Sequence, residues 1–126
     1  MASLAARIFV VGLAAESPEL EALLAEHLKD YEGEILLHLY FGDVTRRFEE
    51  LWQKRSNPSE SAEIRRILDQ LEQGLALEDE DVQNVIAVSF IEDLQDLWPD
   101  PQFEVLLGPK LRHLYVTMRD WDATQR

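Results

Sequence analysis

The residues of this sequence best suited to chemistry are its three histidines and a few closely spaced carboxylates. Glu34 and His38 are four residues apart, a spacing that places two side chains on one face of a helix and offers half of a metal site. A complete site needs further ligands, and the sequence contains no HExxH motif and no ExxH pair of the di-iron type. We therefore predict neither a metal nor a cofactor.

The carboxylates of Glu92, Asp93 and Asp96 form a second cluster, in which Glu92 and Asp96 share the same helical spacing. Two carboxylates act as general acid and base only where their surroundings separate their pKa values. Nothing near them in the sequence suggests an opposing cleft, so a solvated or partner-binding edge is the favoured interpretation. A small enzyme that uses Glu34 with His38, or Glu92 with Asp96, stays open as an alternative and predicts polar groups converging in a pocket.

Nucleophilic and phosphate-binding chemistry find no support in the sequence. The chain has no cysteine, which excludes thiol catalysis, thiolate zinc sites and disulfides. Ser89 lies in an apolar run without the G-x-S-x-G context of a serine nucleophile. We expect its role to be that of a small side chain where two helices contact each other. His27 lies on the apolar stripe of a predicted helix and is expected to be a partly buried structural residue. None of the five glycines forms a phosphate-binding loop, and we predict that the protein is not an enzyme.

The charge of the chain is strongly acidic and unevenly distributed. There are 25 acidic and 12 basic residues, a formal net charge of −13. Eleven of the carboxylates lie between Arg66 and Lys110, where there is no lysine or arginine. Nucleic-acid-binding proteins present basic surfaces, so neither nucleic acid nor an anionic membrane is an expected partner. Concentrated like charge destabilises a compact state, which favours a surface built to bind a basic protein; a purely solubilising surface is the open alternative.

We predict that the partner-binding surface lies along this acidic interval, residues 67–109. Trp98 is expected to anchor it, because tryptophan is common among interface hot spots and an acidic helix precedes it. In the alternative interpretation Trp98 closes the end of the core. The carboxylates expected to supply the charge are Glu78, Asp79, Asp81, Glu92, Asp93, Asp96 and Asp100.

Hydrophobic periodicity places these residues in an all-α fold, a compact bundle of about five helices or a pair of stacked helical hairpins. Ser17 and Pro18 are a typical helix start, and Gly33 is expected to end that helix. The next apolar stripe covers residues 34–54, with a kink or a new start near Gly42 as an option.

The remaining elements follow from similar signals. A third helix is expected to close near Gly74, and the acidic run before Val82 suits the start of a fourth. Residues 85–91 are apolar nearly all round, which favours a central buried helix, although their β-branched content also permits a strand. The last segment starts near Phe103, and Pro109 can begin a fresh helix within it.

The length of 126 residues fits one domain, with an N-terminal apolar segment over residues 1–16 and a frayed tail over residues 120–126. The N-terminal segment shares some features of a signal peptide, but its apolar run is short, so a first helix or strand is favoured. No stretch approaches the roughly 20 apolar residues of a membrane span. We expect a cytoplasmic protein, and the sequence leaves its oligomeric state open.

Three local patterns together resemble a known group of proteins. They are Gly33–His38 (GEILLH), Val85–Glu92 (VIAVSFIE) and Leu106–Pro109 (LLGP). These patterns are similar to those of small bacterial helical domains regarded as candidate immunity proteins of polymorphic toxin systems. The resemblance covers about residues 18–118 and carries over no site residues. It implies a helical fold and a cytoplasmic protector that binds a cognate toxin.

The sequence and the resemblance lead to one functional hypothesis. The protein is expected to be an immunity-type inhibitor that neutralises a basic bacterial toxin through an acidic helix face. Such a face would cover a basic active-site surface and speed the encounter by electrostatic steering. The alternative is an adaptor or subunit that docks a partner helix in a larger complex, which predicts an exposed apolar groove.

Overall fold

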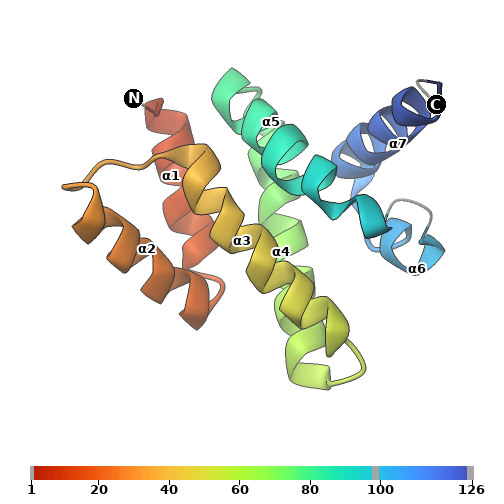
Figure 1. Ribbon diagram of the computed structural model, residues 1–126, viewed down its shortest axis with the longest axis horizontal. Coiled ribbons are helices and arrows are strands. Elements are labelled where there is room, and N and C mark those ends of the chain that lie inside the picture. The colour runs from red at the N-terminus through yellow and green to blue at the C-terminus, as the bar shows by residue number, and fades with distance from the viewer. Residues whose placement is uncertain (1, 98–99, 125–126) are drawn as a thin grey trace.

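The computed structural model describes residues 2–97 and 100–124, and every regular element within them is a helix (Figure 1). The prediction of an all-α fold is confirmed. The elements are α1 (Leu4–Ala14), α2 (Pro18–Asp30), α3 (Leu37–Gln53), α4 (Pro58–Ala76), α5 (Glu80–Ile86), a π-helix (Ala87–Ile91), a 3-10 helix (Glu92–Leu97), α6 (Pro101–Glu104) and α7 (Pro109–Thr124). The seven α-helices exceed the expected five because the N-terminal segment is helical and the last segment divides into two.

Helices α3 and α4 form the centre of the molecule. Helix α3 packs against α2, α4 and the π-helix, and α4 packs against α1, α5 and α7. Figure 1 shows α1 and α2 on one side of this central pair and α6 and α7 on the other. Within the described residues, no helix combines the length and the apolar character needed to cross a membrane.

The boundaries of α2 and α3 follow local rules only in part. The Ser17 hydroxyl accepts a hydrogen bond from the Leu20 amide at 3.2 Å and Pro18 begins α2, as predicted. Gly33 adopts a φ of 85° just beyond the end of that helix, a conformation that glycine adopts without strain. Helix α3 starts at Leu37 rather than near residue 34, and it runs without a break through Gly42.

Helix α4 also runs past a glycine, because Gly74 makes room for α1. A Cβ atom at Gly74 would lie 2.4 Å from the Phe9 ring, so only glycine allows α1 to pack this closely. Close contacts of Ser3 with Asp79 and of Arg66 with Glu16 show that α1 and α4 run antiparallel.

Helix α5, the π-helix and the 3-10 helix follow one another without a loop, and we call residues 80–97 the rod. Its inner side is buried and apolar, so the predicted central helix is confirmed and the strand alternative is excluded. A π-helical turn carries an extra residue per turn, and Leu94 has a non-helical backbone (φ −99°, ψ 35°), so the rod is not a regular α-helix. The buried rod residues include Val82, Val85, Ile86, Phe90 and Ile91.

The C-terminal helices close the core over the end of the rod. Pro109 begins α7 as predicted, and α7 continues to Thr124, beyond the point where the tail was expected to fray. The Tyr115 hydroxyl donates a hydrogen bond to the Leu97 carbonyl at 2.9 Å, which ties α7 to the rod. Phe103 on α6 contacts Phe48, Trp52 and Tyr115 edge to face, at centroid separations of 5.6 to 5.9 Å.

One buried carboxylate joins three helices. Glu63 on α4 accepts hydrogen bonds from the Ser17 hydroxyl at 2.8 Å and from Arg47 Nε and Nη2 at 3.0 and 3.1 Å. Burial by itself raises the pKa of Glu63, but the hydrogen bonds and charge of Arg47 and the hydrogen bond of Ser17 outweigh burial and hold that pKa below its usual value. Helices α2, α3 and α4 are therefore fixed together by an ionised group.

Candidate partner-binding surface

Two of the carboxylates predicted to bind a partner hold the N-terminus of the chain against the rod. Asp79 is the N-cap of α5 and accepts hydrogen bonds from the Val82 amide and from the Ser3 hydroxyl, both at 3.1 Å. Asp81 accepts a hydrogen bond from the Ser3 amide at 3.2 Å. Because Ser3 caps α1 in turn, these two acids connect the first turns of two helices.

Glu72 has a capping role that depends on the tertiary structure. Helix α7 starts after Gly108, which has no side chain with which to cap it. The Glu72 carboxylate of α4 takes that place, accepting hydrogen bonds from the Lys110 and Leu111 amides at 2.9 and 2.8 Å. Its negative charge also lies favourably at the positive end of the helix dipole.

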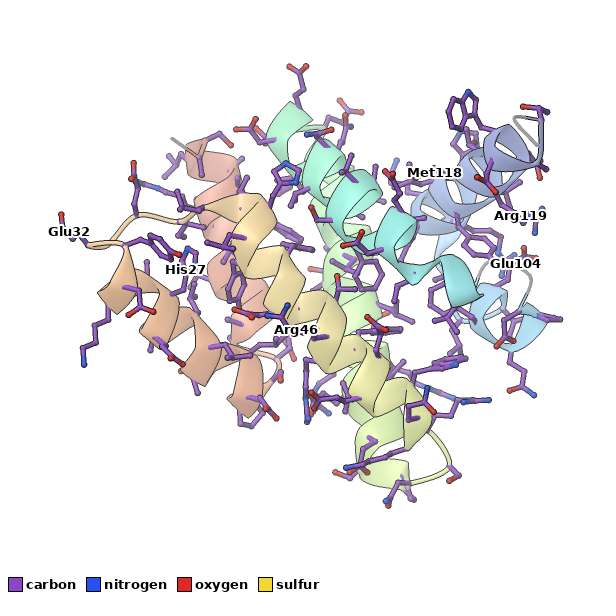
Figure 2. The ribbon with its side chains drawn as sticks, viewed as in Figure 1. His27, Glu32, Arg46, Glu104, Met118 and Arg119 are labelled. Carbon is purple, nitrogen blue, oxygen red and sulfur yellow. The ribbon has the colours of Figure 1, made fainter. Side chains whose placement is uncertain are left out.

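Two further acids of the interval are paired around α6. Asp100, another predicted binding residue, is the N-cap of α6 and accepts a hydrogen bond from the Gln102 amide at 2.9 Å. Glu104 lies 2.9 Å from Arg119 of α7, and Figure 2 shows these two side chains pointing toward each other. Five of the eleven carboxylates in the acidic interval are thus hydrogen-bonded within the fold.

The other carboxylates with described side chains are exposed. Within the part of the chain that the structure describes, none of these acids forms an ion pair. Trp98 and the side chain of Asp96, both predicted site residues, lie outside the described residues. The exposed acids are Asp69, Glu78, Glu80, Glu92 and Asp93.

Four of these exposed acids flank the rod, and we call Glu78, Glu80, Glu92 and Asp93 the acidic ends. Glu78 and Glu80 lie at its start, and Glu92 and Asp93 at its 3-10 turn. About twelve residues, roughly 18 Å of helix, separate the two pairs. Val88, 41% exposed, lies between them. The surface is therefore two charged patches around a small apolar centre rather than one continuous acidic face.

Glu80 is exposed but was not among the predicted binding residues, and Glu92 was grouped with Asp96 on the assumption of an α-helical spacing. Asp79 precedes an apolar run and is a typical N-cap, which leaves Glu80 free in the first turn; this signal was available in the sequence. The α-helical spacing assumed for Glu92 and Asp96 does not apply, because Leu94 interrupts the helix between them.

His38 and Ser89 approach each other closely, although the sequence placed them in separate roles. His38 Nδ1 lies 2.6 Å from Ser89 Oγ, and the Asn84 amide nitrogen lies 3.4 Å from His38 Nε2. The contact fixes α3 against the π-helix, and Thr45 reinforces it by donating to the Ser89 carbonyl at 2.6 Å.

Glu34 and His38, whose spacing was considered above as half of a metal site, do not lie on one helix. Glu34 lies before the first turn of α3, so it does not share a helical face with His38. In the described ranges 2–97 and 100–124, no three histidine or acidic side chains are grouped so that they could hold a metal ion.

His27 has the structural role that its position predicted. It is buried, and its ring lies between α2 and α3, against Tyr31 and Tyr40 (Figure 2). Its Nε2 accepts a hydrogen bond from the Leu36 amide at 3.0 Å, which holds the α2–α3 loop at the start of α3. Because Nε2 is an acceptor there, the ring proton lies on Nδ1.

A hollow of about 450 Å³ lies beside the start of the rod, between the end of α4 and α7. Its lining combines apolar side chains with charged and polar groups, including Glu78 from the acidic ends. The residues that line it are Leu75, Glu78, Gln83, Pro109, Lys110, His113 and Leu114.

The chain belongs to a family described as a domain of unknown function (DUF7674), whose model matches residues 12–122. Comparison with curated proteins found no match, and comparison with solved structures found none either. The match begins within α1 and covers all of α2 to α6.

Proposed function

We propose that this member of the DUF7674 family is a non-enzymatic protein-binding domain that uses the acidic ends of the rod to bind a basic partner. The observation that carries the proposal is that the carboxylates of the acidic interval fall into two groups with different surroundings. One group of carboxylates caps helices or forms hydrogen bonds and ion pairs within the fold. The other group, Glu78, Glu80, Glu92 and Asp93, has no ion-pair partner among the described residues. Unpaired like charges on one element repel each other, and a binding role for them explains why they are gathered there.

The basic partner proposed here is a bacterial toxin that acts on nucleic acid, which would make the domain a cytoplasmic immunity-type inhibitor. A toxin that acts on nucleic acid has a basic groove for the phosphate backbone. Two acidic patches about 18 Å apart suit a groove that is broad enough to contact both. Electrostatic attraction would speed the encounter, and Val88 between the patches offers an apolar contact once water has been displaced.

An adaptor role is the second candidate, and the hollow of about 450 Å³ favours it. Leu75, Pro109 and Leu114 line the hollow, and apolar side chains of this kind can receive a side chain from a partner helix. Binding there would depend on shape and apolar contact, and it would be nearly insensitive to salt.

The two candidates are separated by affinity capture with paired charge variants. The rod variant neutralises the acidic ends as E78Q/E80Q/E92Q/D93N. The control variant, E21Q/E26Q/D30N/E32Q, removes the same four charges from exposed acids of α2 and its following turn. A bacterial lysate is passed over the wild-type protein and both variants, and the retained proteins are quantified by mass spectrometry.

We expect a basic protein to be retained by the wild type and by the α2 control, and to be lost from the rod variant and at high salt. Equal retention by both variants would refute binding through the acidic ends. Retention that Leu114→Glu abolishes, while salt and the rod variant leave it unchanged, would instead identify the hollow as the binding site.

A further inference from the structure

Helix α1 presents an apolar stripe to solvent. Leu4, Ile8 and Val11 are 65%, 62% and 56% exposed and recur on one face of the helix, and the small side chain of Ala15 continues the line one turn later. We call these four residues the α1 stripe. Scattered exposed apolar side chains are ordinary, but consecutive ones on a single helical face mark a contact surface.

The α1 stripe is additional to the contacts that hold α1 in the fold. The opposite face of the helix is already buried against α2, α4 and α5, through Ala6, Phe9, Val10 and Leu13. Helix α1 is therefore apolar on both sides, a property of helices that are covered on both sides.

The charge distribution indicates which molecule covers the stripe. Among the helices of eight or more residues in the described part of the chain, only α1 contains no carboxylate, and its single charged residue is Arg7. Two copies of a protein with a net charge of −13 repel each other strongly where their acidic faces approach. The α1 stripe itself offers a second copy no carboxylate, and the acids nearest its start, Asp79 and Asp81, are hydrogen-bonded to Ser3.

The spacing of the stripe also suits a second copy. Its members are separated by four, three and four residues, which reads the same in both directions along the helix. In an antiparallel pair related by a two-fold axis, Leu4 of one copy lies opposite Ala15 of the other, and Ile8 lies opposite Val11. The same operation places Arg7 opposite Gly12, beside which the side chain of Gln70 on α4 lies. In closely packed helix pairs, the contacting residues of each helix recur at alternating spacings of four and three.

We propose that the protein self-associates through the α1 stripe as an antiparallel two-fold pair. The contact uses a different element from the proposed partner-binding surface, so either proposal can fail without the other. A single helix pair covers less than the roughly 800 Å² per partner of a typical stable interface, so we expect a dissociation constant in the micromolar range or weaker.

Sedimentation equilibrium from about 1 µM to 1 mM tests whether the pair forms. The wild type should shift from monomer to dimer over this range, and Ile8→Glu should stay monomeric. Val105→Glu adds the same charge at an equally exposed apolar residue elsewhere and should behave as the wild type. Circular dichroism checks that both variants are folded.

A wild type that stays monomeric at 1 mM would overturn the proposal, as would an Ile8→Glu variant that dimerises normally. If the monomeric wild type also sediments with uncharged phosphatidylcholine vesicles while Ile8→Glu does not, the stripe is a membrane contact instead.

Disulfide trapping tests the orientation, because the chain has no native cysteine and each variant carries a single thiol. A mixture of Leu4→Cys and Ala15→Cys proteins should form a mixed disulfide under mild oxidation. Leu4→Cys alone should link poorly, because its two thiols lie about 16 Å apart along an antiparallel pair. Efficient linking of Leu4→Cys to itself, without the mixed product, would show a parallel pair and contradict the symmetry argued here.

Discussion

Glu63 and Glu92 are both helical glutamates, and their surroundings give them opposite roles. Glu63 is buried and accepts three hydrogen bonds from Ser17 and Arg47, so its charge belongs to the fold. Glu92 is exposed and pairs with no cation among the described residues, so its charge is available to another molecule. The distinction between these two states decides which carboxylates can be removed without harming the structure.

Removal of the Glu63 charge should therefore destabilise the protein. Glu63→Gln should lower the free energy of unfolding by about 2–4 kcal/mol, because Arg47 would lose its buried charged partner. The control is Glu50→Gln, which removes an exposed carboxylate 3.6 Å from the same arginine and should change stability by less than about 0.5 kcal/mol. Urea unfolding followed by circular dichroism measures both values, and equal effects would contradict the assigned role of Glu63.

The contribution of the Glu63 charge should also be visible in the pH dependence of stability. The pKa of Glu63 is lower in the folded state than in the unfolded chain, so the unfolded chain binds more protons as the pH falls. The contribution of Glu63 is fully present above about pH 4.5 and is lost as the pH falls through its folded-state pKa. The difference in unfolding free energy between the wild type and Glu63→Gln should hence be constant from pH 7 to pH 5 and shrink below pH 4. If the difference between the wild type and Glu63→Gln grew as the pH falls, the lowered pKa of Glu63 in the folded state would be contradicted.

At the scale of elements, two of the glycines within helices can be compared, and packing requires glycine at only one of the two positions. Gly74 lies under Phe9, where a Cβ atom would be only 2.4 Å from the ring, whereas Gly42 has its nearest neighbour, the end of the flexible Arg46 side chain, at 3.6 Å. The first glycine is required by packing between α1 and α4. The second only lowers the helix propensity of α3.

Alanine at these two positions should therefore have effects of opposite sign. Gly74→Ala should destabilise by about 1–3 kcal/mol despite its better helix propensity, because Phe9 must move. Gly42→Ala should stabilise by about 0.5–1 kcal/mol. Thermal unfolding of the two variants measures the difference. A stabilising Gly74→Ala would show that α1 does not pack on α4 as described.

The cap of α7 can be tested by a double-mutant cycle. Glu72→Ala should destabilise by about 1–2 kcal/mol, because two helix amides and the helix dipole lose their anion. Gly108→Ala should also destabilise, because its Cβ would lie 2.6 Å from the Glu72 carboxyl carbon. In the Glu72→Ala background the obstacle is gone, so the second substitution should become much milder. Additive effects in the denaturation data would rule out this capping arrangement.

The sequence predicted those elements whose signals are local. Ser17 with Pro18 marks the start of α2, and Pro109 marks the start of α7, because capping and proline geometry act within a few residues. The predicted start of α3 was wrong by about three residues, since no side chain caps this helix. The preceding loop is held instead by the hydrogen bond that the Leu36 amide donates to His27. The π-helical and kinked parts of the rod leave no periodic signal that separates them from an α-helix.

The candidate site was predictable to a similar degree. Charge segregation alone led to the choice of Glu78, Glu92 and Asp93, which are exposed in the structure. Asp79 and Asp100 were predicted to bind as well, and the structure shows that each is an N-cap. The partners of other carboxylates come from distant parts of the chain, as with Glu72 and the start of α7. No pattern in a single sequence reveals such contacts.

At the scale of the whole molecule, three surfaces have different properties. The acidic ends of the rod have no ion-pair partner in the part of the chain that the structure describes, and the α1 stripe is apolar and free of carboxylates. The hollow beside α7 is lined by apolar and charged side chains. A net charge of −13 opposes contact between copies, so we propose that copies meet at the stripe and that the rod is left for a partner of opposite charge. This arrangement allows a dimer to present two rods.

The association rate of the captured partner is the most direct test of the claim that the rod binds it. Stopped-flow mixing at increasing salt is measured for the wild type, the rod variant E78Q/E80Q/E92Q/D93N and the equally charged α2 control. We predict that the wild type and the α2 control associate rapidly, with rates that fall by about tenfold or more between low and high salt. The rod variant should associate slowly at every salt concentration. If the rod variant and the α2 control show the same rates and the same salt dependence, the acidic ends are not the binding surface.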